Sequence, residues 1–297
     1  MFKKVIVGID GYRSDKDAVA AARAVAPSAK LNLVMVYAAS EEPTTDNLDS
    51  YRELLRGDAI RKLEERQRES GVPEATITAI PSFAPSKGIK EYARAQGADL
   101  IVLGAASRGP LGRAVVGDVA RGVLNGAPCP VLSVARSHAA AATTPRVIGV
   151  AYDSSPEADA ALALAVAVAQ ESGGTIELVE AVDVGVTPQV WGFQVAEYLE
   201  GLVGPEHERL HTLAQTLPVP AKASAVRGSV HKVIHDLSTR VDLLVCGSRS
   251  WGAPGRIAFG STADRLVHHS PCPVMIVPRS ATAEHADPAL AEATAVA

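Results

Sequence analysis

Short, continuously apolar runs alternate along the chain with longer segments whose apolar residues recur every three or four positions. Runs of the first kind are typical of strands in a sheet covered on both faces, and the longer period is typical of helices. The predicted strands are 5–9, 31–37, 75–80, 100–103, 131–134, 147–151, 176–182, 222–226, 243–246 and 274–277. Their alternation with helices predicts right-handed crossovers and a parallel, doubly wound α/β sheet.

The intervening segments supply the predicted helices. One amphipathic helix is marked by apolar residues at steps of three or four, namely Leu48, Tyr51, Leu55, Ala59 and Leu63. The other predicted helices are 15–26, 86–96, 117–124, 156–170, 195–216, 230–237 and 260–267. Pro156 suits the first turn of its helix, where no amide partner is lost.

The second half of the chain repeats the first at a constant distance. Asp10 and Asp153 each follow a predicted strand and lie 143 residues apart. A D-L-[IL]-V-x-G segment begins at Asp99 and again at Asp242, and a P-C-P-V segment recurs at the same spacing. Three segments in one register indicate an internal duplication.

The length of 297 residues also favours two domains, because single domains usually contain about 100–150 residues. Segment 137–145 lacks apolar periodicity and ends in Pro145, as is typical of a linker. We therefore predict domains at 1–136 and 146–279. Residues 280–297 are rich in Ala with scattered Asp, Glu and Pro, and we expect a disordered tail there.

Composition narrows the class of protein. Hydrophobic residues make up 47% of the chain and charged residues 21%, the balance of a soluble globular protein. The net charge of −4 and the dispersed Lys and Arg argue against broad nucleic-acid binding. The start of the chain is too short an apolar run for a secretory signal, and the apolar run 158–169 is shorter than the ~20 residues of a membrane span. We expect a cytoplasmic protein without a membrane segment.

The three cysteines, Cys129, Cys246 and Cys272, form no disulfide or metal-ligand pattern. We interpret them as small buried side chains in a reducing compartment. His231 and His235 lie four residues apart on a predicted helix, a spacing that suits a metal, but no third ligand is evident and solvated histidines are the preferred interpretation. The common nucleophile, phosphate-loop and zinc-protease motifs are missing from the sequence, so we predict no dedicated enzyme.

A Gly-rich loop of the form G-x2-S-x9-G-[D/S] follows the fourth strand of each half. Glycines let backbone amides approach an anion, and the free amides that open the next helix favour phosphate. Arg256 adds a cation in the second loop. The alternative is that both loops are only tight turns. The motif positions are Gly104, Ser107, Gly117 and Asp118 in the first half and Gly247, Ser250, Gly260 and Ser261 in the second.

The carboxylates of Asp10 and Asp153 come at the end of the first strand of each half. Ligands of doubly wound sheets collect at the carboxyl ends of the strands, near the point where the strand order reverses. We therefore regard both residues as candidate ligand contacts, with capping of the following turn as the alternative.

Together, the strand–Asp start, the D-L-[IL]-V-x-G segment, the Gly-rich loop and the P-C-P-V strand resemble the universal stress protein family over residues 1–136 and 145–279. The resemblance implies a five-stranded parallel sheet in the order 3-2-1-4-5, flanked by helices. It also implies an ATP site in some members, with the loop pattern G-x2-G-x9-G-[S/T], whereas other members bind no nucleotide. By the same resemblance Asp10 and Asp153 lie near the nucleoside, and the backbone of Val36 and Ala181 meets adenine.

The sequence departs from the ATP-binding pattern of this family. Ser107 and Ser250 replace the second glycine, and Asp118 stands where the second half has Ser261. A carboxylate beside triphosphate repels it unless Mg²⁺ or an arginine compensates. We therefore expect ATP, with or without Mg²⁺, to bind better in the second domain.

Two functions from different classes follow from this resemblance. The first is a nucleotide-dependent stress sensor or regulator, with no more than slow ATP hydrolysis. The alternative is a nucleotide-free interaction or dimerisation module of the same fold. In both, the fifth strands at 131–134 and 274–277 are apolar edges that invite pairing, so we expect the halves to meet there as a pseudo-dimer. Whole chains are expected to associate again as a homodimer.

Overall fold

The computed structural model describes residues 1–12, 14–39, 46–104, 118–134, 143–183, 193–248 and 270–278. The first half contains β1 (Lys4–Gly8), α1 (Ser14–Val25), β2 (Lys30–Tyr37), α2 (Asp46–Glu69), β3 (Thr76–Pro81), α3 (Pro85–Gln96), β4 (Leu100–Gly104), α4 (Asp118–Leu124) and β5 (Val131–Val134). The second half contains β6 (Val147–Tyr152), α5 (Pro156–Ser172), β7 (Thr175–Val182), α6 (Phe193–Thr216), β8 (Ala221–Arg227), α7 (Val230–Ser238), β9 (Leu243–Gly247) and β10 (Val274–Val277).

These elements confirm the expected strands and helices to within two residues at each end, except that α2, marked in the sequence by apolar residues up to Leu63, continues to Glu69. The helix expected over 260–267 lies outside the described residues. Among the helices that are described, none is both long enough and apolar enough to cross a bilayer.

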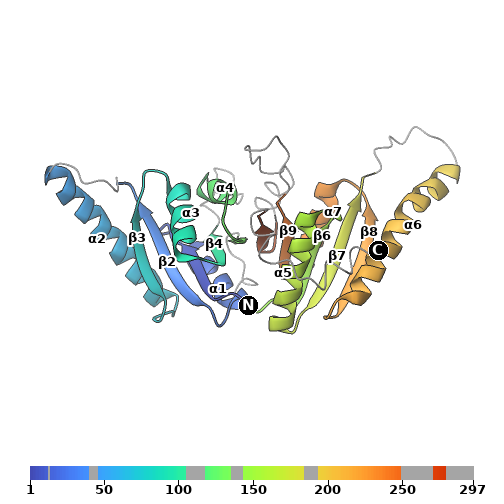
Figure 1. The fold of residues 1–297 in the computed structure, drawn as a ribbon, viewed down its shortest axis with the longest axis horizontal. Helices are drawn as coiled ribbons and strands as arrows, with labels where there is room; N and C mark the ends of the chain where they lie inside the picture. The colour runs from blue at the N-terminus through green and yellow to red at the C-terminus, as the bar shows by residue number, and fades with distance from the viewer. Residues whose placement is uncertain are drawn as a thin grey trace.

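All ten strands belong to one sheet, in the order β3-β2-β1-β4-β5-β10-β9-β6-β7-β8 (Figure 1). Each half therefore has the order 3-2-1-4-5, and its strands pair in parallel. The predicted doubly wound α/β class and strand order are confirmed. In this order β2 and β3 are added on one side of β1, and β4 and β5 are added on the other side. The strand order therefore reverses between β1 and β4, and likewise between β6 and β9, and these are the two switch points.

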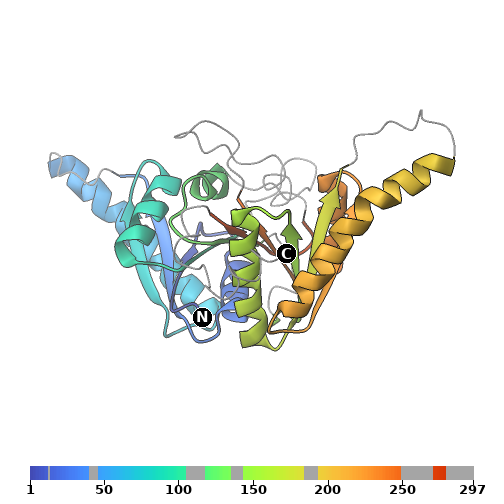
Figure 2. The same ribbon diagram turned by 45° about the vertical axis from the view of Figure 1, so that its right-hand side comes forward.

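Helices cover both faces of the sheet, so central strands such as β4 and β9 are buried on both sides (Figures 1 and 2). Val5 and Val7 of β1 pack in one aliphatic cluster with α1, α2, α5 and α6. Ile6, which points to the opposite face, packs in a second cluster with α3, α4 and α7. Both clusters run through both halves, and their continuity explains why central strands such as β4, β9 and β10 are apolar along their whole length.

The two halves join through an antiparallel pair of β5 and β10. Leu132 lies opposite Met275, and both side chains are fully buried. These two residues occupy the same position in the two repeats, so a pseudo-two-fold axis passes between them. The expected meeting of the fifth strands is confirmed, and the pairing leaves only β3 and β8 as edges of the sheet.

A repeated aspartate ties the amino ends of the first and fourth strands together. The carboxylate of Asp99 accepts hydrogen bonds from the backbone N–H of Lys3 (2.8 Å) and Lys4 (3.1 Å). The carboxylate of Asp242 accepts them from the backbone N–H of Arg146 (2.8 Å) and Val147 (2.9 Å) in the same way. This bond explains why each apolar fourth strand is preceded by Asp.

The junction of the halves can be tested by truncating a side chain on the pseudo-two-fold axis. Leu132→Ala should lower the free energy of unfolding by about 2–5 kcal/mol, because it opens a cavity in the continuous core. Leu54→Ala, at a position that is 67% exposed, is the control and should stay within about 0.5 kcal/mol of the wild type. Urea denaturation followed by probes in each half should show both halves shifting together. A shift confined to the first half would contradict a shared core.

Candidate functional site

Asp10 and Asp153 lie just past the first strand of their half, at the two switch points. The carboxylate of Asp10 accepts a hydrogen bond from the backbone N–H of Tyr12 (2.9 Å). The carboxylate of Asp153 accepts from the backbone N–H (3.1 Å) and the hydroxyl (2.5 Å) of Ser155. The turn-capping interpretation of both residues is therefore present in the structure, and it holds each carboxylate in place at the strand end.

The turn that carries each aspartate requires a left-handed residue. Gly11 has φ of +89°, and Ser154, at the matching position of the second half, has φ of +59°. Ser154 is the only residue other than glycine with positive φ in the part of the chain that the structure describes. A side chain in the left-handed region destabilises the folded state by about 1–2 kcal/mol, so Ser154 lowers the stability of the second half.

The end of β2 presents backbone groups to the switch point. The N–H of Ile9 donates to the C=O of Val34 (2.8 Å), whereas Ser82 donates to Tyr37 on the other side of the strand (3.0 Å). Successive residues of a strand face opposite neighbours. The N–H and C=O of Val36 therefore face the β1 side, beyond the point where β1 turns away.

The end of β7 repeats this arrangement in the second half. Gly228 donates to the C=O of Val182 on the β8 side (3.1 Å), so the backbone of Ala181 faces β6. Ala181 follows Val36 by 145 residues rather than 143. The strand registers show the reason, because the segment that joins the first two strands is two residues longer in the second half.

The first glycine of each Gly-rich loop has a packing role. A Cβ on Gly104 would lie 2.8 Å from the backbone oxygen of Ser14, and one on Gly247 would lie 2.5 Å from that of Glu157. The end of the fourth strand thus packs directly on the first turn of the helix that follows the first strand. Glycine at these positions therefore lets the start of each loop lie against the helix that follows the Asp10 or Asp153 turn.

The other predicted loop residues cannot be placed. Asp118 is the first residue of α4, and its side chain is outside what the structure describes. The residues that lie outside the described ranges are Ser107, Gly117, Ser250, Arg256, Gly260 and Ser261.

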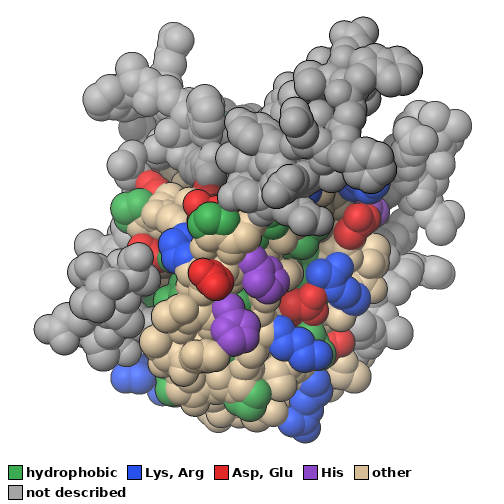
Figure 3. All heavy atoms as spheres, turned by 90° about the vertical axis from the view of Figure 1, so that its right-hand side faces the viewer, with side chains coloured by type: hydrophobic (Ala, Val, Ile, Leu, Met, Phe, Trp, Pro, Cys, Tyr) green, Lys and Arg blue, Asp and Glu red, His purple; other side chains and the backbone are tan. Residues whose placement is uncertain are grey.

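The face at the α6, α7 and β8 end of the molecule carries histidine side chains beside acidic and basic ones (Figure 3). Within the described ranges, no group of three or more His, Cys, Asp or Glu residues could hold a metal, and that covers His231 and His235. The cysteines are buried as predicted. Burial raises the pKa of the Cys129 and Cys246 thiols to about 12, so they are poor nucleophiles at neutral pH.

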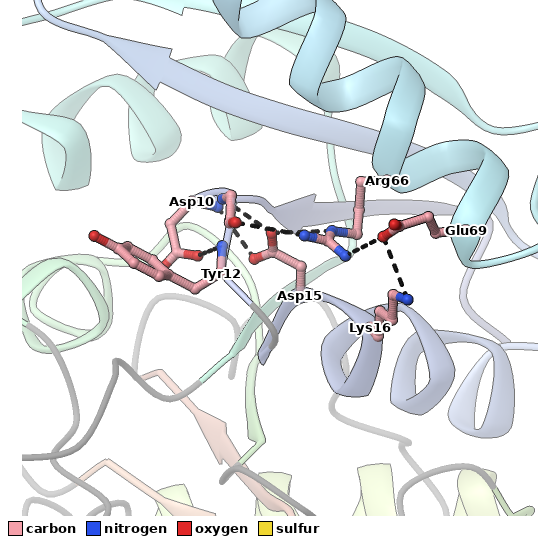
Figure 4. Close-up of polar contacts among 7 residues, drawn as sticks. Asp10, Tyr12, Asp15, Lys16, Arg66 and Glu69 are labelled. Carbon is pink, nitrogen blue, oxygen red and sulfur yellow. Dashed lines mark hydrogen bonds and ion pairs between the residues drawn. The ribbon is translucent and has the colours of Figure 1, made fainter.

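Sequence reasoning missed a buried carboxylate in the first half, Asp15 (Figure 4). Its two oxygens accept hydrogen bonds from the backbone N–H of Asp10 (3.1 Å) and of Gly11 (2.9 Å). Arg66 of α2 lies 3.3 Å from one of these oxygens and also pairs with Glu69 (2.6 Å). In the sequence Asp15 is one of several acidic residues at a helix start, which gives no sign of its partners.

Burial, and next the charge of Asp10, raise the pKa of Asp15 from 3.8 to about 7. The attraction of Arg66 acts in the opposite direction and is outweighed. A carboxylate that resists ionisation at the start of a helix, beside a candidate ligand contact, is typical of a functional site.

The second half has different residues around the turn that follows its first strand. Ala158 stands at the position of Asp15. Arg209 of α6 pairs with Glu180 (2.5 Å) and Glu206 (2.8 Å), and its guanidinium lies 5.9 Å from the centre of the Tyr152 ring. Both halves thus anchor an arginine of their second helix by ion pairs, and in the first half this arginine is connected to the aspartate turn.

The two turns can be compared by exchanging their left-handed residues. Ser154→Gly should raise the free energy of unfolding by about 0.5–1 kcal/mol, because glycine tolerates positive φ. Gly11→Ala should lower it by about 1–2 kcal/mol for the converse reason. Thermal and urea unfolding of both variants measure these changes. Destabilisation by Ser154→Gly would contradict the strained conformation.

The raised pKa of Asp15 predicts a pH dependence of stability. Between its unfolded value of 3.8 and its folded value of about 7, the folded protein binds more protons than the unfolded chain, so stability falls as the pH rises through this window. Asp15→Asn cannot titrate and should lose this part of the decline. Urea unfolding at several pH values between 4 and 8 should show the wild type losing stability relative to the variant. Glu91→Gln, on exposed α3 surface, should run parallel to the wild type.

Comparison with known proteins shows which family the sequence and fold resemble. Residues 1–135 and 145–278 each match the Universal stress protein family. A universal stress protein of Thermus aquaticus is 31% identical over 141 residues, which cover 45% of this chain and 99% of the relative. Universal stress protein MJ0531 of Methanocaldococcus jannaschii is 28% identical over 142 residues, which cover 45% of this chain and 82% of the relative.

A solved structure supports the fold of the whole tandem. The crystal structure of a universal stress protein from Archaeoglobus fulgidus matches 93% of this chain and 98% of its own, with a TM-score of 0.67 and 20% identity. At that identity the likeness concerns the fold alone. The two matches to the family together span most of the sequence. The chain therefore belongs to the Universal stress protein family and contains two tandem copies of its domain.

Proposed function

We propose that this protein is a stress-response regulator that binds ATP at the carboxyl end of each half of its sheet. The observation that carries the proposal is the duplicated switch point. In each half a carboxylate is held at the end of the first strand, beside the backbone of the second strand that faces it and a close-packed glycine of the fourth. Both halves contain this arrangement, although the side chains around it differ between them.

The chemistry of ATP fits these groups. Adenine offers a ring nitrogen acceptor and an amino donor, which match the N–H and C=O of Val36 or Ala181. Ribose hydroxyls match the carboxylates of Asp10 or Asp153 as acceptors. The phosphates then extend along the Gly-rich loop toward the amides that open the following helix.

We infer further that the second half binds ATP more tightly. Asp118 begins α4, whereas Ser261 at the matching position is neutral and can donate a hydrogen bond. Two like charges about 4 Å apart repel by about 1 kcal/mol in water and by more near a protein surface. A bound Mg²⁺ would convert this repulsion into bridging, with Asp118 as its ligand.

The alternative function is a nucleotide-free interaction module, and one observation favours it. Both strand-end carboxylates already accept hydrogen bonds from their own turns, so a nucleoside must share them. In that case the regulatory output rests on surface contacts alone. Association of whole chains into a homodimer, measured by light scattering, is compatible with either function.

Calorimetry with ATP tests the proposal. The wild type should bind with two affinities that differ by about tenfold or more. Asp118→Ser should strengthen the weaker site, and Gly260→Val should remove the tighter one because a branched side chain blocks the approach of phosphate to the amides. Gly117→Val is the matched control and should remove only the weaker site. A repeat with a chelator present reveals any contribution of Mg²⁺.

Mass spectrometry of small molecules released from the denatured protein complements the titration. Release of an adenine nucleotide would support the proposal. No released nucleotide together with no heat of ATP binding would establish the alternative module.

A further inference from the structure

We propose that Asp15 and Arg66 are positioning residues of the first-half site, which hold the turn after β1 so that Asp10 faces the nucleoside. The inference rests on the proposed function, because the contact of Asp10 with nucleoside is itself proposed. In the second half Ser155 positions Asp153 instead, and the pair of Asp15 and Arg66 has no counterpart.

The first step of the argument is the geometry of the turn. Asp15 is the acceptor for the backbone N–H of Asp10 and of Gly11 through different carboxylate oxygens. Its side chain is only 2% exposed, so water cannot take over these bonds. Arg66 reaches the same carboxylate through Nε (3.3 Å) and the C=O of Gly11 through a terminal nitrogen (3.5 Å). One clamp therefore fixes two consecutive residues of the turn.

The second step is the support of the clamp (Figure 4). Arg66 donates to Glu69 one turn further along α2, and Glu69 also pairs with Lys16 of α1 at 3.3 Å. The guanidinium is thus held from α1 and α2 at once. A guanidinium fixed in this way can orient a carboxylate through its planar set of donors.

The charges around Asp15 are few. Asp10 in its own turn and Arg66 on α2 act on it directly, and Glu69 and Lys16 lie beyond Arg66. Lys62 of α2 lies beside Gly11 and pairs with Asp58 (2.8 Å). β4 and β5, which pack against α1, present aliphatic side chains to it.

The third step is that the fold does not need this carboxylate. The second half builds the same turn, with the same left-handed residue, although Ala158 replaces Asp15. Burial of the Asp15 carboxyl opposes its ionisation, so above neutral pH the charge reduces stability. The Asp15 carboxylate thus lowers stability, and the second half folds the same turn without it. Its effect on Asp10 is therefore the best explanation for its presence.

The clamp also makes the first-half site sensitive to pH. A proton on Asp15 removes the charge that attracts Arg66 and turns one acceptor oxygen into a donor facing a backbone N–H. The turn should then loosen as the pH falls through about 7, the value to which the pKa of Asp15 is raised. In the second half Asp153 is held by a serine, which does not titrate, so its turn should not respond.

Hydrogen exchange of the ligand-free, full-length protein tests the clamp without any nucleotide. At pH 8 the amides of Asp10 and Gly11 should exchange about tenfold faster in Asp15→Asn than in the wild type, after correction for intrinsic rates. In the wild type their protection should fall between pH 8 and pH 6. The turn at Ser154 is the internal control and should remain unchanged. Wild-type protection in Asp15→Asn would overturn the proposal.

ATP titration in a Gly260→Val background, which isolates the first half, tests the positioning role. Asp15→Asn should weaken binding by about tenfold at pH 8 and flatten its pH profile, Arg66→Gln should weaken it similarly, and Arg66→Lys should restore part of it. Glu91→Gln is the charge-removing control and should bind as the parent does. If Asp15→Asn fails to fold, the comparison of Arg66→Gln with Arg66→Lys still tests the proposal.

The two experiments separate this inference from the function on which it rests. A wild type that binds no ATP, yet shows the expected exchange pattern, would remove the proposed function and leave the clamp. Tight first-half binding that is unchanged in affinity and pH profile by Asp15→Asn and by Arg66→Gln would overturn the inference and leave the proposed function.

Discussion

The antiparallel contact between β5 and β10 is the constraint on which the rest of the architecture depends. A half-sheet in the order 3-2-1-4-5 leaves a short, mainly apolar fifth strand at its edge, and such an edge must be covered. Pairing two of them buries both, merges the two half-sheets, and lets one aliphatic core on each face run from end to end. The switch points are then equally far from the junction, each separated from it by the fourth and fifth strands of its half.

Much of this organisation was predictable because its causes are local or repeated. Continuously apolar strands, a fixed spacing of 143 residues and a strand-end aspartate are all visible in the sequence. The cause of the glycines at Gly104 and Gly247 was not visible, because it is contact with a helix far away in the chain. The clamp of Asp15 was missed for the same reason, since Arg66 lies 51 residues away. The left-handed backbone conformation of Ser154 could have been inferred only by aligning this residue with Gly11 of the first half.

The duplication provides a comparison within one molecule. The same backbone turn, strand order and anchoring aspartate occur twice, so these features are what the fold requires. The contacts of the arginine on the second helix differ between the two halves. Arg66 is tied to the aspartate turn, whereas Arg209 is tied to Glu180, Glu206 and the ring of Tyr152. Differences of this kind are free to tune each half separately.

The position of Leu132 opposite Met275 has a consequence for how the tandem can change. In a dimer of identical single domains, a residue on the two-fold axis meets its own copy, so every substitution there alters both sides of the contact at once. Covalent fusion breaks that symmetry, and here leucine meets methionine. It also replaces a bimolecular encounter with a high effective concentration, so the shared sheet forms at any expression level. The linked chain can therefore evolve its two sides independently without losing the partner that each side needs.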